Sequence, residues 1–165
     1  MNLNKRLQMD LPETVCLFFS TILRDEVINT LLRQIQSKFN SFACSIWAYD
    51  APMHEFICIK NTHNFSPKID GSTIFENEGL LGSVRMTKKG IISNNAENDY
   101  RHSSFITDKL NLVIRSIICV PIILDGEVIG ALEVVDKNPS KFKPADLKLI
   151  EDIVNTTTHN FENGN

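Results

Sequence analysis

The spacing of apolar residues divides the chain into helical and extended segments. Across residues 11–39 apolar side chains recur every three or four positions, which predicts amphipathic helix. The helix is expected to break near Arg24–Asp25, where Asp25 can cap a second helix. From Ala43 the period becomes two, so Ala43–Tyr49 and Glu55–Asn61 are predicted to form a hairpin around the turn at 50–53.

The stretch from Arg115 to Lys137 consists of two almost wholly apolar segments around Asp125-Gly126. Asp and Gly readily adopt the positive φ angles of a two-residue hairpin turn, so the two segments are expected to pair antiparallel. In the second segment the odd positions share one face and the even positions share the other: Ile129, Ala131, Glu133 and Val135, against Val128, Gly130, Leu132 and Val134. Both faces are mainly apolar, so helices should cover one, and another element or a ligand the other.

The remaining pattern completes an α+β domain with a mainly antiparallel central sheet and helices at both ends of the chain. One domain is expected over residues 1–165, with flexible ends at 1–10 and 162–165. The other predicted elements are a strand near 72–75 in the polar loop 64–77, a helix at 80–87, a strand at 91–93, a helix at 105–110 capped by Ser103 or Ser104, and a helix from Pro144.

Composition excludes several classes of function. The chain is 42% hydrophobic with a formal net charge of −3, and no basic patch is interleaved with aromatic residues, so a nucleic-acid partner is not expected. No apolar run approaches the ~20 residues of a membrane helix. The polar start MNLNKRLQMD is unlike a signal peptide. We therefore expect a cytoplasmic protein without a membrane partner.

The four cysteines are Cys16, Cys44, Cys58 and Cys119. Their number and spacing fit neither a disulfide framework nor a zinc site, so no metal is expected. A symmetric first hairpin would place Cys44 roughly opposite Cys58. We interpret the two as small buried side chains, with a redox pair as the alternative.

Two local patterns carry candidate chemistry. In Gly79-Leu80-Leu81-Gly82 a glycine precedes a predicted helix, whose first amides could bind an anion or water. Asp99, His102 and Ser103 or Ser104 are the residue types of a nucleophilic triad, but triads are defined by geometry, so no catalytic residue is predicted.

Four sequence pieces in this order resemble a GAF domain: GLLGSV at 79–84, NDYRH at 98–102, RSIICVPI at 115–122 and GEVIGALEVVDK at 126–137. The resemblance covers nearly the whole chain and is most specific in its second half. It implies a twisted antiparallel sheet with a helical layer on one face and a ligand pocket on the other. It also implies a sensor rather than an enzyme.

The segment DKNPSKFKPADL at 136–147 resembles the cyclic-nucleotide-binding GAF domains of phosphodiesterases. Lys137, Phe142 and Asp146 match that pattern, whereas Asp136 replaces an Asn and Leu147 replaces a Glu. The resemblance implies that Lys137 and Asp146 form a structural pair between the last strand and the final helix.

The resemblance also implies a set of ligand-binding residues. Ser45 would lie against a purine, and Leu80 and Leu81 would offer backbone groups at the start of the helix. Glu133 would meet a purine amino group or a nucleoside hydroxyl, or else pair with Arg115 or lie near solvent. The lid helix would add Ile106, Thr107 and Asp108. Ile114, just before the long strand that begins at Arg115, would pack on the base.

The sequence therefore predicts a sensor that binds cAMP or cGMP, needs no cofactor and signals through a homodimer formed by the terminal helices. Ligand would enter between the sheet and lid segments 64–77 and 94–110. No histidine is predicted on the pocket face, and no cysteine lies in a bilin-attachment context, so haem and bilin are not expected. The alternatives are a dimerisation scaffold with a vestigial pocket, and a free methionine sulfoxide reductase-like enzyme that uses Cys119.

Overall fold

The computed structural model of the chain describes residues 26–63 and 69–163. It is built on a six-stranded antiparallel sheet in the order β3-β2-β1-β6-β5-β4. The strands are β1 (Ala43–Asp50), β2 (Glu55–Asn61), β3 (Thr73–Phe75), β4 (Ile91–Ser93), β5 (Ser116–Leu124) and β6 (Glu127–Asp136). The helices are α3 (Glu26–Phe39), α5 (Gly79–Thr87), the 3₁₀ turn η1 (Ala96–Asn98), α6 (Phe105–Lys109) and α7 (Pro144–Glu162).

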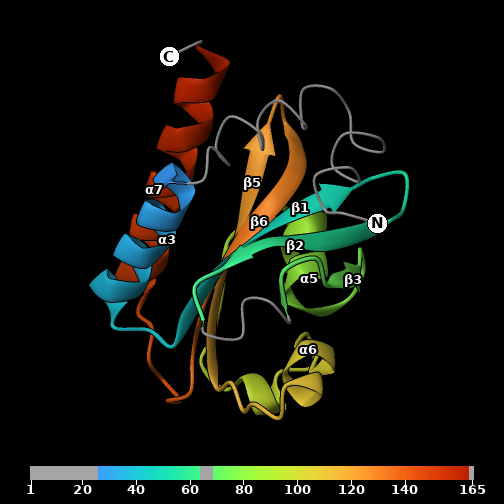
Figure 1. Cartoon of the computed structure of the whole chain (residues 1–165), viewed down its shortest axis with the longest axis vertical. Coiled ribbons are helices and arrows are strands. Elements are labelled where there is room, and N and C mark those ends of the chain that lie inside the picture. The colour runs from blue at the N-terminus through green and yellow to red at the C-terminus, as the bar shows by residue number, and fades with distance from the viewer. Residues whose placement is uncertain (1–25, 64–68, 164–165) are drawn as a thin grey trace.

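The helices form two layers (Figure 1). Helices α3 and α7 lie side by side on one face of the sheet, and α5 and α6 lie on the other. The predicted α+β class is confirmed, as are the helices at 80–87 and 105–110 and the strands at 72–75 and 91–93 to within two residues. The predicted helix at 11–22 and its break at Asp25 lie outside the described residues.

The β5–β6 hairpin has the predicted turn. Asp125 and Gly126 have φ angles of 50° and 79°, so both occupy the left-handed region that a two-residue turn of this kind requires. The predicted alternation holds for Glu133 but not for Ile129. A β-bulge between Ile122 and Ile123 shifts the register, so Ile129 packs on the α3–α7 side of the sheet.

Each face of the sheet has its own apolar cluster, as expected for a sheet with two covered faces. The cluster under the terminal helices includes Ile28, Leu32, Ile118, Val134 and Ile150. The cluster under α5 and α6 includes Trp47, Phe56, Leu81, Ile114 and Ala131. The pocket described below lies within this second cluster.

The first hairpin departs from the symmetric register. Its turn spans residues 51–54, and a bulge between Ile46 and Trp47 places Cys58 opposite Trp47. Cys44 lies beside Thr62, whose amide donates to the Cys44 carbonyl at 2.9 Å. The two cysteines face opposite sides of the sheet, so the predicted Cys44–Cys58 juxtaposition is wrong.

The predicted pair between Lys137 and Asp146 is not formed. Asp146 instead accepts a hydrogen bond from the Lys143 amide at 2.7 Å and so caps the start of α7. Lys137 Nζ lies 4.2 Å from the centroid of the Phe42 ring. Phe142 does have a structural role, because it is 3% exposed and packs in the cluster under α7.

Candidate ligand-binding site

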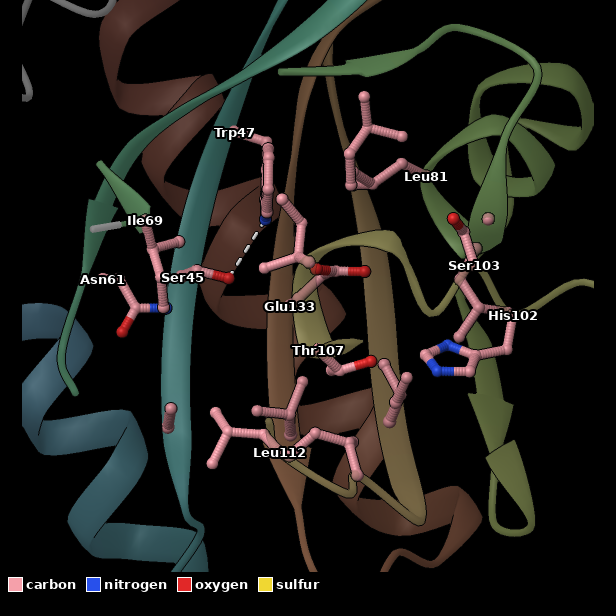
Figure 2. Close-up of a pocket in the computed structure, with 18 of the residues that line it drawn as sticks. Ser45, Trp47, Asn61, Ile69, Leu81, His102, Ser103, Thr107, Leu112 and Glu133 are labelled. Atoms are coloured by element: carbon pink, nitrogen blue, oxygen red, sulfur yellow. Dashed lines mark hydrogen bonds between the residues drawn. The ribbon is translucent and has the colours of Figure 1, made fainter. Parts of the chain in front are cut away.

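A cavity lies between the sheet and the layer of α5 and α6, on the face away from α3 and α7 (Figure 2). The volume open to the centre of a water-sized sphere is about 90 Å³, which leaves room for several water molecules. Since ligand pockets typically measure ~300 to 1,000 Å³, a nucleotide-sized ligand requires the surrounding segments to move outward. Its polar and charged lining residues are Ser45, Trp47, Asn61, His63, Glu78, His102, Ser103, Thr107 and Glu133.

The floor of the cavity is formed by adjacent strands of the sheet. Ser45 on β1 pairs with Glu133 on β6, and both side chains line the cavity, whereas Cys119, the partner of Glu133 on β5, does not. The Trp47 indole Nε1–H donates to Ser45 Oγ at 3.0 Å, the bond drawn as a dashed line in Figure 2. Strand pairing therefore places a hydroxyl and a carboxyl side by side in an otherwise apolar floor.

Glu133 is held in an environment that disfavours its charge. Burial raises the pKa of Glu133 to about 7, although interactions with the Trp47 indole and the Cys119 thiol act in the opposite direction. The internal partner considered for it, Arg115, forms an ion pair with Glu97 at 2.7 Å instead. In the part of the chain that the structure describes, no Lys, Arg or His forms an ion pair with Glu133.

Helix α5 forms one wall, and two glycines allow its close approach. Gly79 has φ +66°, and a Cβ on it would lie 3.3 Å from Ser103 Cβ. A Cβ on Gly82 would lie 2.5 Å from the carbonyl carbon of Asn77, so only glycine fits there. Leu80 and Leu81, which are 3% and 1% exposed, both line the cavity.

The lid helix α6 contributes two of its three predicted residues. Ile106 and Thr107 line the cavity, and so does Ile114 in the segment that follows. Asp108 does not line it. Its exposed carboxylate accepts a hydrogen bond from Ser104 Oγ at 2.6 Å, because residues four apart share one side of a helix and this side faces outward.

The structure adds pocket residues that the sequence did not reveal. His63 and His102 both line the cavity, so the expectation of no histidine on the pocket face is wrong. Both follow regular elements in irregular segments, where no periodicity indicates a side chain's direction. Burial lowers the pKa of both rings; Lys137 adds to this effect at His63, whereas Asp99 and Asp108 oppose it at His102.

The residue types of a triad do not assemble. Asp99 accepts hydrogen bonds from Arg101 Nε at 2.9 Å and Nη2 at 2.7 Å, which hold the pKa of its carboxyl well below the usual range. His102 and Ser103 line the cavity, but the acid that would orient the imidazole is engaged by Arg101.

The cysteines of the described residues lack the properties of nucleophiles. Cys44, Cys58 and Cys119 are free and buried, and burial raises the pKa of all three thiols. A thiol with a raised pKa is a poor nucleophile, because the thiolate is the reactive form. None of the three is a cavity-lining residue.

The sequence model of the GAF domain family matches residues 23–162, and the chain belongs to this family. GAF domains are a sensor and regulatory class, generally without catalytic activity. A probable 3′,5′-cyclic phosphodiesterase of Caenorhabditis elegans is 32% identical over 69 residues, which are 42% of this chain. The match covers 10% of that relative's length.

Solved structures share the fold at low sequence identity. The GAF domain of a phosphoenolpyruvate-protein phosphotransferase from Coxiella burnetii has a TM-score of 0.73 and 14% identity, covering 99% of both chains. The free methionine-R-sulfoxide reductase of Neisseria meningitidis, solved with its substrate, has a TM-score of 0.72 and 14% identity, covering 98% of this chain and 92% of that one. No helix in the described ranges is both long and apolar enough to cross a membrane.

Proposed function

We propose that this GAF domain is a sensor that binds a cyclic nucleotide, cAMP or cGMP, in the cavity between the sheet and helices α5 and α6. The observation that carries the proposal is the floor, where Ser45 and Glu133 stand side by side among apolar residues. A flat purine would pack on the apolar walls, and its polar edge would meet these two side chains. The phosphodiesterase relative supports this ligand class.

The proposed ligand contacts come from the floor and from both walls. Ser45 and Glu133 would bind polar groups of the ligand. The apolar side chains of Leu80, Leu81, Ile106 and Ile114, with the Thr107 hydroxyl, would enclose it. The small cavity implies that α6 and residues 69–77 move outward to admit ligand and order on closure, which slowed hydrogen exchange of their amides would detect.

Calorimetry tests the ligand class directly. Titration of the whole chain with cAMP and with cGMP should release or absorb heat with one site per chain, and the tighter of the two identifies the base. Absence of heat with both at millimolar ligand would contradict the proposal.

Glu133→Ala tests the floor. Because the substitution removes the carboxyl that would accept a hydrogen bond from the ligand, binding should weaken by about tenfold, the equivalent of one hydrogen bond of ~1.4 kcal/mol. The matched control is Glu127→Ala, which removes an exposed carboxyl in the β5–β6 hairpin outside the cavity. An unchanged dissociation constant in Glu133→Ala would make Glu133 a structural residue.

We propose no catalytic role for the chain. The structural likeness to a methionine sulfoxide reductase concerns the fold, and the raised thiol pKa values of Cys58 and Cys119 favour unreactive thiols. Turnover of free methionine sulfoxide with a thiol reductant should therefore be absent. Turnover abolished by Cys119→Ser would reverse this assignment.

The signal would pass through a homodimer formed by the terminal helices. Leu149, 37% exposed on α7, places an apolar side chain on the surface of that helix. We also propose a cytoplasmic setting, which is consistent with the free thiols of Cys44, Cys58 and Cys119. A dimerisation scaffold with a vestigial pocket would show the same dimer but no ligand.

A further inference from the structure

Charge is unevenly distributed around the cavity. At its α5 end, Glu78 lines the cavity and is the N-cap residue of the helix, with no side-chain capping hydrogen bond. A carboxylate beside a helix N-terminus already balances the positive end of the helix dipole and repels a second anion. This end is therefore unfavourable for an anionic group of a ligand.

Positive charge lies at the edge of the cavity where the segment before β1 meets the segment after β6. Here Phe42 and His63 line the cavity with their ring centroids 4.3 Å apart, and Lys137 Nζ lies 4.2 Å from the Phe42 centroid. We call these three residues the Phe42 rim. A lysine over an aromatic face is attracted by the ring and held near it, so the ammonium is positioned at the edge of the cavity.

Lys137 has no carboxylate partner within the described part of the chain. Among residues 26–63 and 69–163 no Asp or Glu forms an ion pair with it, and Asp146 caps α7 instead. Arg115 donates to the Lys137 carbonyl at 3.2 Å, but its own charge is paired with Glu97. Burial, and after it the charge of Lys137, lowers the pKa of His63, in keeping with the short distance between Lys137 and the Phe42–His63 pair.

We infer that the cavity binds an anion at the Phe42 rim, so that a ligand lies with its anionic group between His63 and Lys137 and its hydrogen-bond donors on Glu133. The inference rests on the proposed function only for the identity of the ligand. For a cyclic nucleotide, it places the phosphate at the rim, away from the N-terminus of α5. Leu80 and Leu81 then provide apolar contacts rather than amides for the phosphate.

The register of the floor sets the spacing that such a ligand must have. Ala43 pairs with Val135 beside the rim, and the next inward pair on the same face is Ser45 with Glu133. Two residues along a strand span about 7 Å. A nucleotide, with a sugar between base and phosphate, can bridge this distance. A free amino acid carries its ammonium and carboxylate on the same carbon and cannot reach both ends.

Inorganic phosphate tests the rim without depending on a nucleotide. In the nitrogen-15-labelled whole chain at neutral pH, phosphate should shift the imidazole resonances of His63 and raise the pKa of that ring, since a nearby anion favours imidazolium. Lys137→Gln should weaken this response about tenfold. The matched control is Lys89→Gln, the same charge change at an exposed site outside the cavity, and it should respond as the wild type does.

Three results would overturn the inference: shifts confined to the amides of Leu80 and Leu81, a response unaffected by Lys137→Gln, or no response of His63 to phosphate. The melting temperatures of both lysine variants should equal that of the wild type. A lost response would then reflect the lost charge rather than unfolding. If Lys89→Gln weakened the response as much as Lys137→Gln does, the phosphate would be bound as an adventitious ion only, and this would count against the rim.

A second arm separates the rim from the proposed ligand. Lys137→Gln should weaken cAMP or cGMP binding about tenfold while leaving adenosine or guanosine, which lack the phosphate, unaffected. If no nucleotide binds but phosphate shifts His63 in a Lys137-dependent manner, the proposed function fails and the rim stands. If nucleotides bind equally to both variants, the rim inference fails and the proposed function stands.

Discussion

At the scale of single residues, Glu133 is the position where burial and chemistry conflict. Its carboxyl stands in the floor beside Ser45, and burial raises its pKa to about 7 from the ordinary 4.5. A carboxyl whose folded pKa exceeds its unfolded pKa holds its proton longer in the folded state. The folded state therefore loses stability as the pH rises from about 4.5 to about 7, and this loss persists above that range.

Glu133→Gln should remove this pH dependence. Relative to the wild type, the variant should gain on the order of 2 kcal/mol in unfolding free energy between pH 5 and pH 8, since one pKa unit corresponds to ~1.4 kcal/mol. Urea denaturation at both pH values measures the difference. Glu127→Gln, at the exposed first position of β6, should follow the wild type at both. Parallel curves for the wild type and Glu133→Gln would contradict the assignment of a raised pKa.

At the scale of elements, helix α5 is fixed by close contact of its backbone with the preceding segment. The α carbon of Gly82 faces the main chain of Asn77, and a Cβ would lie 2.5 Å from its carbonyl carbon and 2.9 Å from its Cα. Backbone atoms cannot move aside as a flexible side chain can. Glycine, a poor helix former, is therefore required inside this helix by tertiary contact.

Gly82→Ala should destabilise the domain although alanine favours helix by ~1 kcal/mol. The clash with Asn77 is expected to exceed that gain and leave a net loss of ~1 to 2 kcal/mol, as for other overpacked sites. The measurement is the unfolding free energy in urea. Ser83→Ala, the next residue of the same helix, is the control and should lie within ~0.5 kcal/mol of the wild type. A Gly82→Ala variant as stable as that control would show that the segment around Asn77 can yield.

At the scale of the whole molecule, the sheet separates the cavity from the terminal helices. The cavity lies on the α5–α6 face, and α3 and α7 cover the other face (Figure 1). Strand β6 contributes Leu132 and Val134 to one face and Glu133 to the other. In the proposed function, a ligand that moves the floor would act on the terminal helices through a single layer of packed strands.

Leu149→Glu should convert the proposed homodimer to monomer, because a charge at this exposed apolar position of α7 would be desolvated in the interface. Light scattering after size-exclusion chromatography measures the mass of the whole chain. Asn155→Glu adds the same charge at another exposed site on α7 and should leave the dimer intact. A monomeric wild type, or equal dissociation of both variants, would argue against α7 as the interface.

Several features were determined by the sequence alone because local rules govern them. The Asp125-Gly126 pair predicts a hairpin turn, and the positive φ angles of both residues confirm it. Period-two alternation predicts that Glu133 shares a face with Ala131, and Glu133 lines the cavity on that face. Helical spacing and Pro144 predict α7. These predictions depend on neighbours in the chain, so no long-range contact is needed to make them.

Other features were decided only by tertiary structure. A bulge in the β5–β6 pair turns Ile129 to the face covered by α3 and α7, and a bulge in the β1–β2 pair separates Cys44 from Cys58. Both bulges arise from strand pairing, which the spacing of apolar residues cannot reveal. His63 and His102 enter the cavity from irregular segments, and Lys137 stacks on Phe42 instead of pairing with Asp146. Side-chain direction in irregular segments and the choice between competing ion partners depend on distances set by the assembled fold. The sequence thus determined the sheet, its hairpins and the carboxyl in its floor, and tertiary packing decided the charge distribution around the cavity.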